Sequence, residues 1–95
     1  MKLAWSALAV RELRALRRHS VQRWGFEVSQ RYLAEIADPA KRLSAEPGRA
    51  RLLRGKFRIV RVRSHYLIAQ VDAERGLVTI ARVLHAAMDI ERHLP

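Results

Sequence analysis

The 95 residues suffice for a single domain, 1–95, with one modest core, and 19 basic against 9 acidic residues give a formal net charge of +10. That charge predicts an anionic partner, which can be nucleic acid, an acidic protein or a membrane surface. The lack of cysteine excludes disulfides and thiolate sites and suits the cytoplasm, and no apolar run approaches the roughly 20 residues of a membrane span.

The opening segment KLAWS, residues 2–6, predicts a short strand, and Ser6 is placed to cap the helix that follows. A helical pattern runs from Ala7 to about Arg23, because one stripe recurs at steps of three and four: Ala9, Leu13, Leu16, Ser20 and Trp24. The apolar part of this start is short and arginine-rich helix follows at once. We therefore expect no signal peptide and a cytoplasmic protein.

Gly25 ends the first helix, and a second helix is expected to begin near Phe26. Its apolar stripe comprises Leu33, Ile36, Ala37, Ala40 and Leu43. A proline inside a helix removes a hydrogen bond and costs roughly 3 kcal/mol. Asp38-Pro39 therefore predicts a kink or a short restart over 39–45 with Asp38 as its cap, and EPGR at 46–49 predicts a turn.

The second half of the chain is strand-like, at 56–62, 65–71 and 77–84. The links at 63–64 and 72–76 are short, which predicts antiparallel neighbours. Alternation along the first of these strands places Arg58, Val60 and Val62 on one face and Phe57, Ile59, Arg61 and Arg63 on the other. The order β-α-α-β-β-β predicts an α+β fold in which a helical hairpin packs on a small antiparallel sheet.

The basic residues form two groups. Arg11, Arg14 and Arg18 fall within a roughly 60° arc of the first helix, which is either a solvated face or a binding face. The second group surrounds the first hairpin and comprises Arg51, Arg54, Lys56, Arg58, Arg61 and Arg63. The face shared by Phe57, Ile59, Arg61 and Arg63 is apolar at one end and cationic at the other, which suits an acidic peptide or a nucleic-acid backbone.

The last segment, RVLHAAMDIERHLP at 82–95, carries two histidines eight residues apart with Asp89 between them. Zinc needs three or four ligands, so we expect no metal here, and Asp89 is better placed as a helix N-cap before IERHL. The sequence has no glycine-rich phosphate loop and no recognisable Ser-His-Asp arrangement. We therefore expect no cofactor and no catalytic residues of those kinds.

Three stretches carry a resemblance to a known family. RVLHAAMDIERHL resembles the closing signature of the ParE branch of the RelE/ParE toxin superfamily, VRSHYLIAQV resembles its preceding strand, and WSALAVRELRAL resembles its opening strand and first helix. The resemblance implies a toxin of a type II toxin–antitoxin module that poisons DNA gyrase. A ParD-like antitoxin would neutralise it, and operator DNA would be bound only through the antitoxin's ribbon-helix-helix domain.

The resemblance and the charge pattern together suggest which residues act. Antitoxin binding is assigned to Phe57, Arg58, Ile59, Arg61, Arg63, Arg11, Arg14 and Arg18, and target contact to the C-terminal residues Arg82, His85, Met88, Asp89, Arg92 and His93. In the tail, we expect Leu84, Met88 and Leu94 to anchor the chain. We expect His85, Asp89 and Arg92 to hold its path by hydrogen bonds.

Relatives of the RelE branch instead cut mRNA on the ribosome, using basic residues on the sheet and often a tyrosine near the C-terminus. Acid–base cleavage of RNA in this chain would draw on Arg61, Arg82, His85 and His93. The tail has no tyrosine, so the resemblance favours a gyrase inhibitor that is not an enzyme. The ribosome-dependent nuclease is the alternative, and an inactive or differently targeted toxin is a third interpretation.

Overall fold

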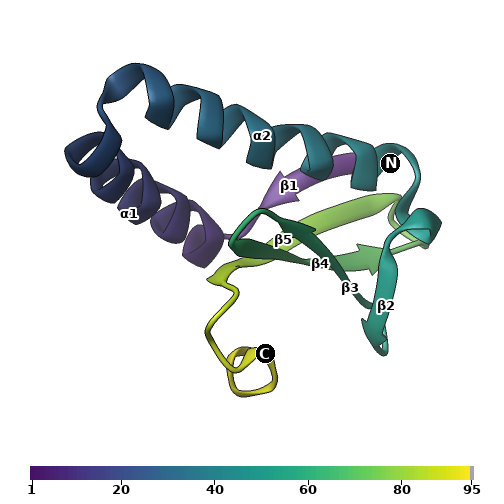
Figure 1. Ribbon diagram of the computed structural model, residues 1–95. Helices are drawn as coiled ribbons and strands as arrows, with labels where there is room; N and C mark the ends of the chain where they lie inside the picture. Colours follow the sequence, from purple (N-terminus) through teal and green to yellow (C-terminus); the bar gives the residue numbers. More distant parts are fainter. Residues whose placement is uncertain (95) are drawn as a thin grey trace.

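The computed structural model describes residues 1–94 as two helices on one face of a five-stranded sheet (Figure 1). The elements are β1 (Lys2–Trp5), α1 (Ala7–Trp24), α2 (Phe26–Ala45), the 3-10 turn η1 (Pro47–Arg49), β2 (Arg51–Arg54), β3 (Phe57–Val62), β4 (His65–Asp72), β5 (Leu77–His85) and the 3-10 turn η2 (Ile90–His93). The predicted α+β fold, with a helical hairpin packed on a small sheet, is confirmed, and the sheet is mostly rather than wholly antiparallel.

The strands follow the order β1-β5-β4-β3-β2. The three predicted hairpin strands are antiparallel neighbours as expected, whereas β1 pairs in parallel with β5 and Leu3 lies opposite Val78. Strand β2 was not predicted. It is an edge strand of four residues between η1 and Gly55, too short for alternation to show in the sequence, and its register against β3 is irregular between Leu52 and Arg54.

Helix α2 corrects the prediction at Asp38-Pro39. The helix continues from Phe26 to Ala45 with Pro39 inside it, so there is no restart and Asp38 is not a cap. Ile36 and Leu43 on either side of the proline are buried, and each contributes roughly 1.5–3 kcal/mol. This burial offsets the roughly 3 kcal/mol cost of a helical proline.

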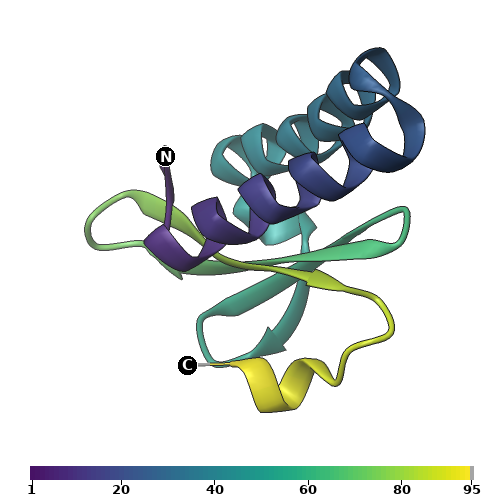
Figure 2. The same ribbon diagram turned by 90° about the vertical axis from the view of Figure 1, so that its left-hand side faces the viewer.

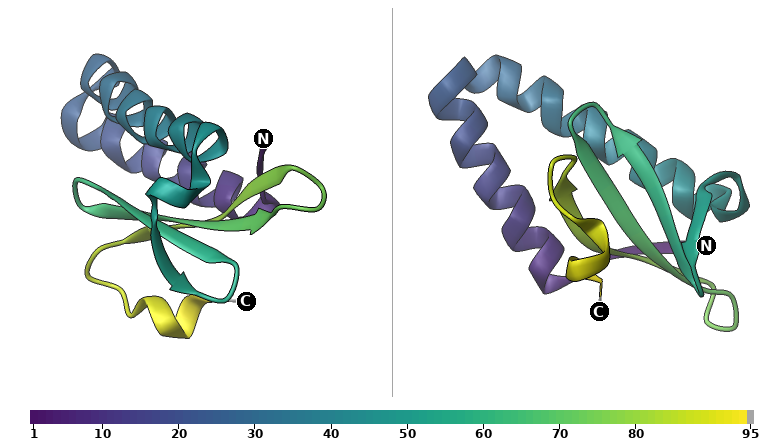
Figure 3. Two further views of the ribbon diagram at one scale, coloured as in Figure 1. Left: turned by 90° about the vertical axis from the view of Figure 1, so that its right-hand side faces the viewer. Right: turned by 60° about the horizontal axis from the view of Figure 1, so that its bottom comes forward.

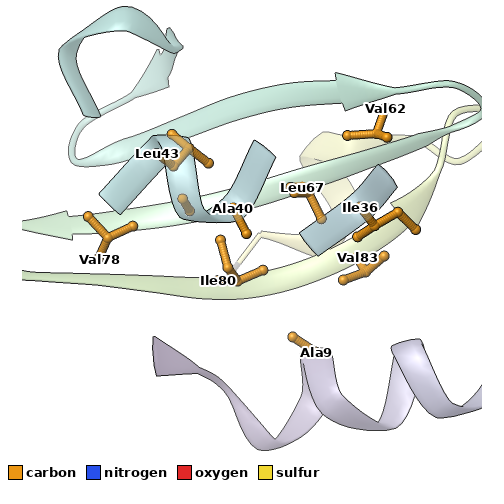
Figure 4. Close-up of a cluster of buried hydrophobic side chains, with 10 residues drawn as sticks. Ala9, Ile36, Ala40, Leu43, Val62, Leu67, Val78, Ile80 and Val83 are labelled. Carbon is orange, nitrogen blue, oxygen red and sulfur yellow. The ribbon is translucent and has the colours of Figure 1, made fainter. Parts of the chain in front are cut away.

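The main core lies between the helices and the sheet (Figure 4). Its buried members are Ala9 of α1, the α2 residues Ile36, Ala40 and Leu43, and the strand residues Val62, Leu67, Ala69, Val78, Ile80 and Val83. Between the two helices, the buried hydroxyls of Ser20 and Ser29 are 2.6 Å apart. The predicted stripes are therefore confirmed at their centres, while Trp24 is 47% exposed at the tip of the hairpin.

A second, smaller apolar cluster lies on the opposite face of the sheet. Ile59, Ile68 and Leu84 are buried there, and the partly buried residues packed on them are Leu53, Phe57, Tyr66, Ile90 and Leu94. The C-terminal segment passes beneath this face and supplies the last two of these side chains (Figures 2 and 3). The sheet is thus covered by the helices on one side and by the tail on the other.

Neither helix of residues 1–94 is both long enough and apolar enough to cross a membrane.

Candidate functional site

The C-terminal tail is held against the sheet by apolar side chains and by its own hydrogen bonds. The amide of Ala86 donates to the carbonyl of Ser64 at 2.7 Å, and Nδ1 of His85 accepts from the amide of Ala87 at 3.1 Å. Asp89 caps η2, because its carboxylate accepts from the amide of Glu91 at 3.2 Å. The cap and the docking of Leu94 are confirmed, and Pro95 lies outside the described residues.

Arg82 is the centre of a partly buried polar network that the sequence did not reveal. Its guanidinium donates to the Glu12 carboxylate at 2.9–3.3 Å and, through Nη1, to the backbone carbonyl of His93 at 2.8 Å. Glu12 also accepts from the amide of Val83 at 2.9 Å. The side chains of Arg82 and Glu12 are only 16% and 19% exposed. Arg82 therefore ties α1, β5 and the tail together, and its assignment to target contact stays a prediction.

The remaining tail residues divide into inner and outer positions. Met88 is 40% exposed, so the expectation that it anchors the tail is wrong, and Ile90 packs on the sheet in its place. Arg92 is exposed, and its only ion pair within residues 1–94 is the one with Asp89 at 3.5 Å. His85 is exposed and His93 is half-buried. The outer side of the tail is thus formed by Met88, Asp89 and Arg92.

The residues of β3 assigned to antitoxin binding do not form one surface. Phe57 and Ile59 lie under the tail, while Arg58 points to the other face and donates to the carbonyl of Ala50 at 3.0 Å. Arg61 lies over the Tyr66 ring, 5.6 Å from its centroid.

Arg63 departs from the predicted face because β3 ends at Val62. It occupies the turn with φ of 52° and forms an ion pair with Glu35 of α2. This hydrogen-bonded guanidinium lowers the pKa of the Glu35 carboxyl below its usual value. Phe57, Ile59 and Arg61 therefore share one face of β3 as predicted, whereas Arg63 lies beyond the end of the strand and does not belong to that face.

The cations of α1 adjoin an apolar hollow that was not predicted. Arg11, Arg14 and Arg18 are exposed. A hollow of about 280 Å³ between the two helices is lined by Arg14 and Arg17 together with Trp5, Leu13, Leu33, Ile36 and Ala37. Cationic and apolar groups therefore meet beside the helical hairpin rather than along the face of β3.

Comparison with known proteins agrees with this architecture. The family model described as "ParE toxin of type II toxin-antitoxin system, parDE" matches residues 3–90. The chain belongs to the ParE toxin family. Toxin ParE1 of Mycobacterium tuberculosis, in strains CDC 1551 / Oshkosh and ATCC 25618 / H37Rv, is 35% identical to it over an alignment of 75 residues, and the match covers 76% of each chain.

A solved structure shows the same fold. It is described as the chromosomal ParDE TA system from P. aeruginosa, and the match has a TM-score of 0.77 with 19% sequence identity. It covers 90% of this chain and 95% of that chain. The ParE fold thus extends over nearly all of the described chain.

A cluster of rings joins α2 to the sheet in this ParE-family protein. The Tyr32 hydroxyl is 2.6 Å from Nδ1 of His65, and the rings of His65 and His85 meet edge to face with centroids 5.2 Å apart. Trp24 completes the row, 5.9 Å from the Tyr32 ring. Burial, and to a lesser degree the neighbouring His85, lower the pKa of His65 below its usual 6.5.

This lowered pKa predicts that acid destabilises the protein through His65. The folded state binds a proton at His65 less readily than the unfolded chain, so the stability that the neutral ring provides is present above about pH 6.5 and is lost as the pH falls through the lowered folded-state pKa. Melting curves at about pH 7.5 and about pH 5 should show a smaller acid-induced loss for His65→Gln than for wild type. His19→Gln, which alters an exposed histidine, is the control, and an unchanged loss in His65→Gln would contradict this account.

Proposed function

We propose that this ParE toxin inhibits DNA gyrase and does not cut RNA. The observation that supports this most is the engagement of Arg82. Nε and Nη2 donate to Glu12 and Nη1 donates to the carbonyl of His93, so all three guanidinium nitrogens are already engaged inside the protein and compete with binding of an RNA phosphate. The tail also packs over Ile59, Ile68 and Leu84 on the face of the sheet that carries Arg61. Membership of the ParE family points the same way.

The outer side of the tail is the proposed contact with gyrase. Met88, Asp89 and Arg92 are exposed on a segment whose inner side is anchored by Ile90 and Leu94. An exposed apolar side chain beside exposed charges is typical of the edge of a protein interface. His85 lies at the start of the same segment and extends this surface.

Neutralisation is proposed to come from a ParD-like antitoxin with an acidic, amphipathic segment. Its apolar side chains would enter the hollow between α1 and α2, and its carboxylates would meet Arg14 and Arg17 on the border. Arg11 and Arg18 would extend the cationic surface along α1, and Arg61 and Arg63 would add to it at the β3–β4 turn. Contact with Phe57 or Ile59 would require the tail to leave the sheet first. The toxin would reach operator DNA only through the antitoxin.

The test separates the two targets in purified systems. We expect the protein to inhibit DNA supercoiling by gyrase or to trap cleaved DNA, to leave ribosome-bound mRNA intact, and to lose its effect when the antitoxin of the same module is added. Codon-positioned mRNA cuts that disappear in His85→Ala or Arg61→Ala, with the fold retained, would instead establish the nuclease.

A further inference from the structure

The outer surface of α1 carries four arginines that nothing in residues 1–94 neutralises. Arg11, Arg14, Arg17 and Arg18 are all exposed, and no carboxylate of the described chain forms an ion pair with any of them. Glu12, the only acidic residue of α1, is turned away to Arg82. At 1.5 Å rise per residue, the four span about 10 Å of the helix, all within a 120° arc. We call them the arginine face.

An aromatic side chain lies at one end of this face. A hollow of about 520 Å³ is lined by Arg14, Arg17, Arg18, Val21, Gln22 and Phe26. Phe26 begins α2 and is 53% exposed, although an aromatic ring of this size is normally buried in a core. No acidic residue contributes to this lining. The hollow thus combines several guanidinium groups with an open aromatic ring.

This combination matches the chemistry of one class of ligand. Guanidinium groups bind the phosphates of a polynucleotide, and an exposed aromatic ring stacks on an unpaired base. In a duplex, the faces of the bases are covered by their neighbours, so Phe26 would have nothing to stack on. We propose that the arginine face and Phe26 bind single-stranded DNA, with the backbone along α1 and one base on the Phe26 ring.

The choice of DNA over RNA rests on the proposed action on gyrase, which works on DNA. The surface would let the toxin hold an unpaired DNA segment while its tail contacts the enzyme. Arg14 and Arg17 border both this hollow and the apolar hollow between the helices. An antitoxin seated on those two arginines would therefore compete with the DNA strand.

The experiment measures fluorescence anisotropy of a labelled thymidine oligonucleotide of about 12 nucleotides with the purified full chain, across about 50–200 mM salt. We expect Arg14→Gln/Arg18→Gln to weaken binding about tenfold or more at low salt and to reduce the slope of log affinity against log salt by about 1.4, since each phosphate contact on a single strand contributes about 0.7. Phe26→Ala should weaken binding at least about fivefold at every salt concentration, because stacking does not depend on counterions.

Two controls make the test specific. Lys41→Gln/Arg42→Gln removes the same charge from the exposed far half of α2, and Val28→Ala removes another exposed apolar side chain of that helix. Both should leave affinity within about twofold, and circular dichroism should show that all variants are folded.

Three results would overturn the proposal. The first is an equal loss of oligonucleotide affinity in Arg14→Gln/Arg18→Gln and Lys41→Gln/Arg42→Gln, and the second is a loss in Phe26→Ala no larger than that in Val28→Ala. The third is tighter binding of a DNA duplex or of an RNA strand than of the single-stranded DNA. The assay contains no gyrase. A protein that binds the oligonucleotide as expected but leaves gyrase active would contradict only the proposed target.

Discussion

Glu12→Ala is expected to lower the free energy of unfolding by about 3 kcal/mol, the largest effect of any single charged side chain in this protein. The substitution leaves the Arg82 guanidinium, 16% exposed, without its carboxylate, and it removes the acceptor of the Val83 amide. Breaking a largely buried ion pair from one side is far more destabilising than its net contribution suggests. Chemical denaturation followed by circular dichroism should show the loss, together with a melting temperature lower by more than about 10 °C.

The control for Glu12→Ala is an exposed ion pair that also joins a glutamate and an arginine. Glu46 forms an ion pair with Arg49 on the surface, and Glu46→Ala should stay within about 0.5 kcal/mol of wild type. In the double variant Glu12→Ala/Arg82→Leu, no uncompensated charge remains, so part of the loss should be recovered. A Glu12→Ala protein that unfolds at the wild-type denaturant concentration would show that the network does not hold the tail and α1 to β5.

Leu94→Ala is expected to destabilise the protein by about 1.5 kcal/mol, which is the lower end for a buried leucine because Leu94 is only partly buried. The residue lies beside the C-terminus, where an undocked chain would tolerate the change without effect. Thermal melts should therefore show a clear decrease for Leu94→Ala. A melting curve identical to that of wild type would mean that the tail is not docked in solution.

Substitutions in the tail should affect stability and toxicity independently of each other. Arg92 is exposed and pairs only with Asp89 of the same segment among residues 1–94. Arg92→Ala should melt within about 0.5 kcal/mol of wild type and still reduce growth inhibition on induced expression. Unchanged growth inhibition would remove Arg92 from the proposed contact with gyrase.

The regular parts of this fold were predictable because they follow a period. Strand β3 alternates, and the helices repeat at three and four residues, so positions such as Val62 and Ile36 could be placed on a shared face from the sequence. Strands β4 and β5 have consecutive buried residues because both faces of the sheet are packed. The departures occur where a tertiary contact overrides a local rule. Pro39 stays inside α2 because its neighbours are buried, and Arg63 leaves its expected face because the turn places it beside Glu35.

The candidate sites were less predictable, because they depend on contacts between distant residues. The Glu12–Arg82 pair joins positions 70 residues apart, and neither residue stands in a motif. One signal was present: Glu12 is the single acidic residue of an arginine-rich helix. The hollow between the helices also combines side chains of β1, α1 and α2, which no local pattern places together.

The pairing of β1 with β5 has a consequence for how the protein is made. Trp5 lies opposite Ile80, and the Ser6 hydroxyl donates to the carbonyl of Ala81. Within residues 1–94, β1 pairs with no strand other than β5. Bringing Trp5 and Ile80 together closes the whole intervening chain into a loop, which costs conformational entropy, and strand pairs this far apart in sequence slow folding. During translation the helices and the β3–β4 hairpin emerge before β5, so β1 has no strand to pair with until then. A product released before β5 has been translated would therefore lack the parallel pair, and the sheet is complete only once β5 has been made.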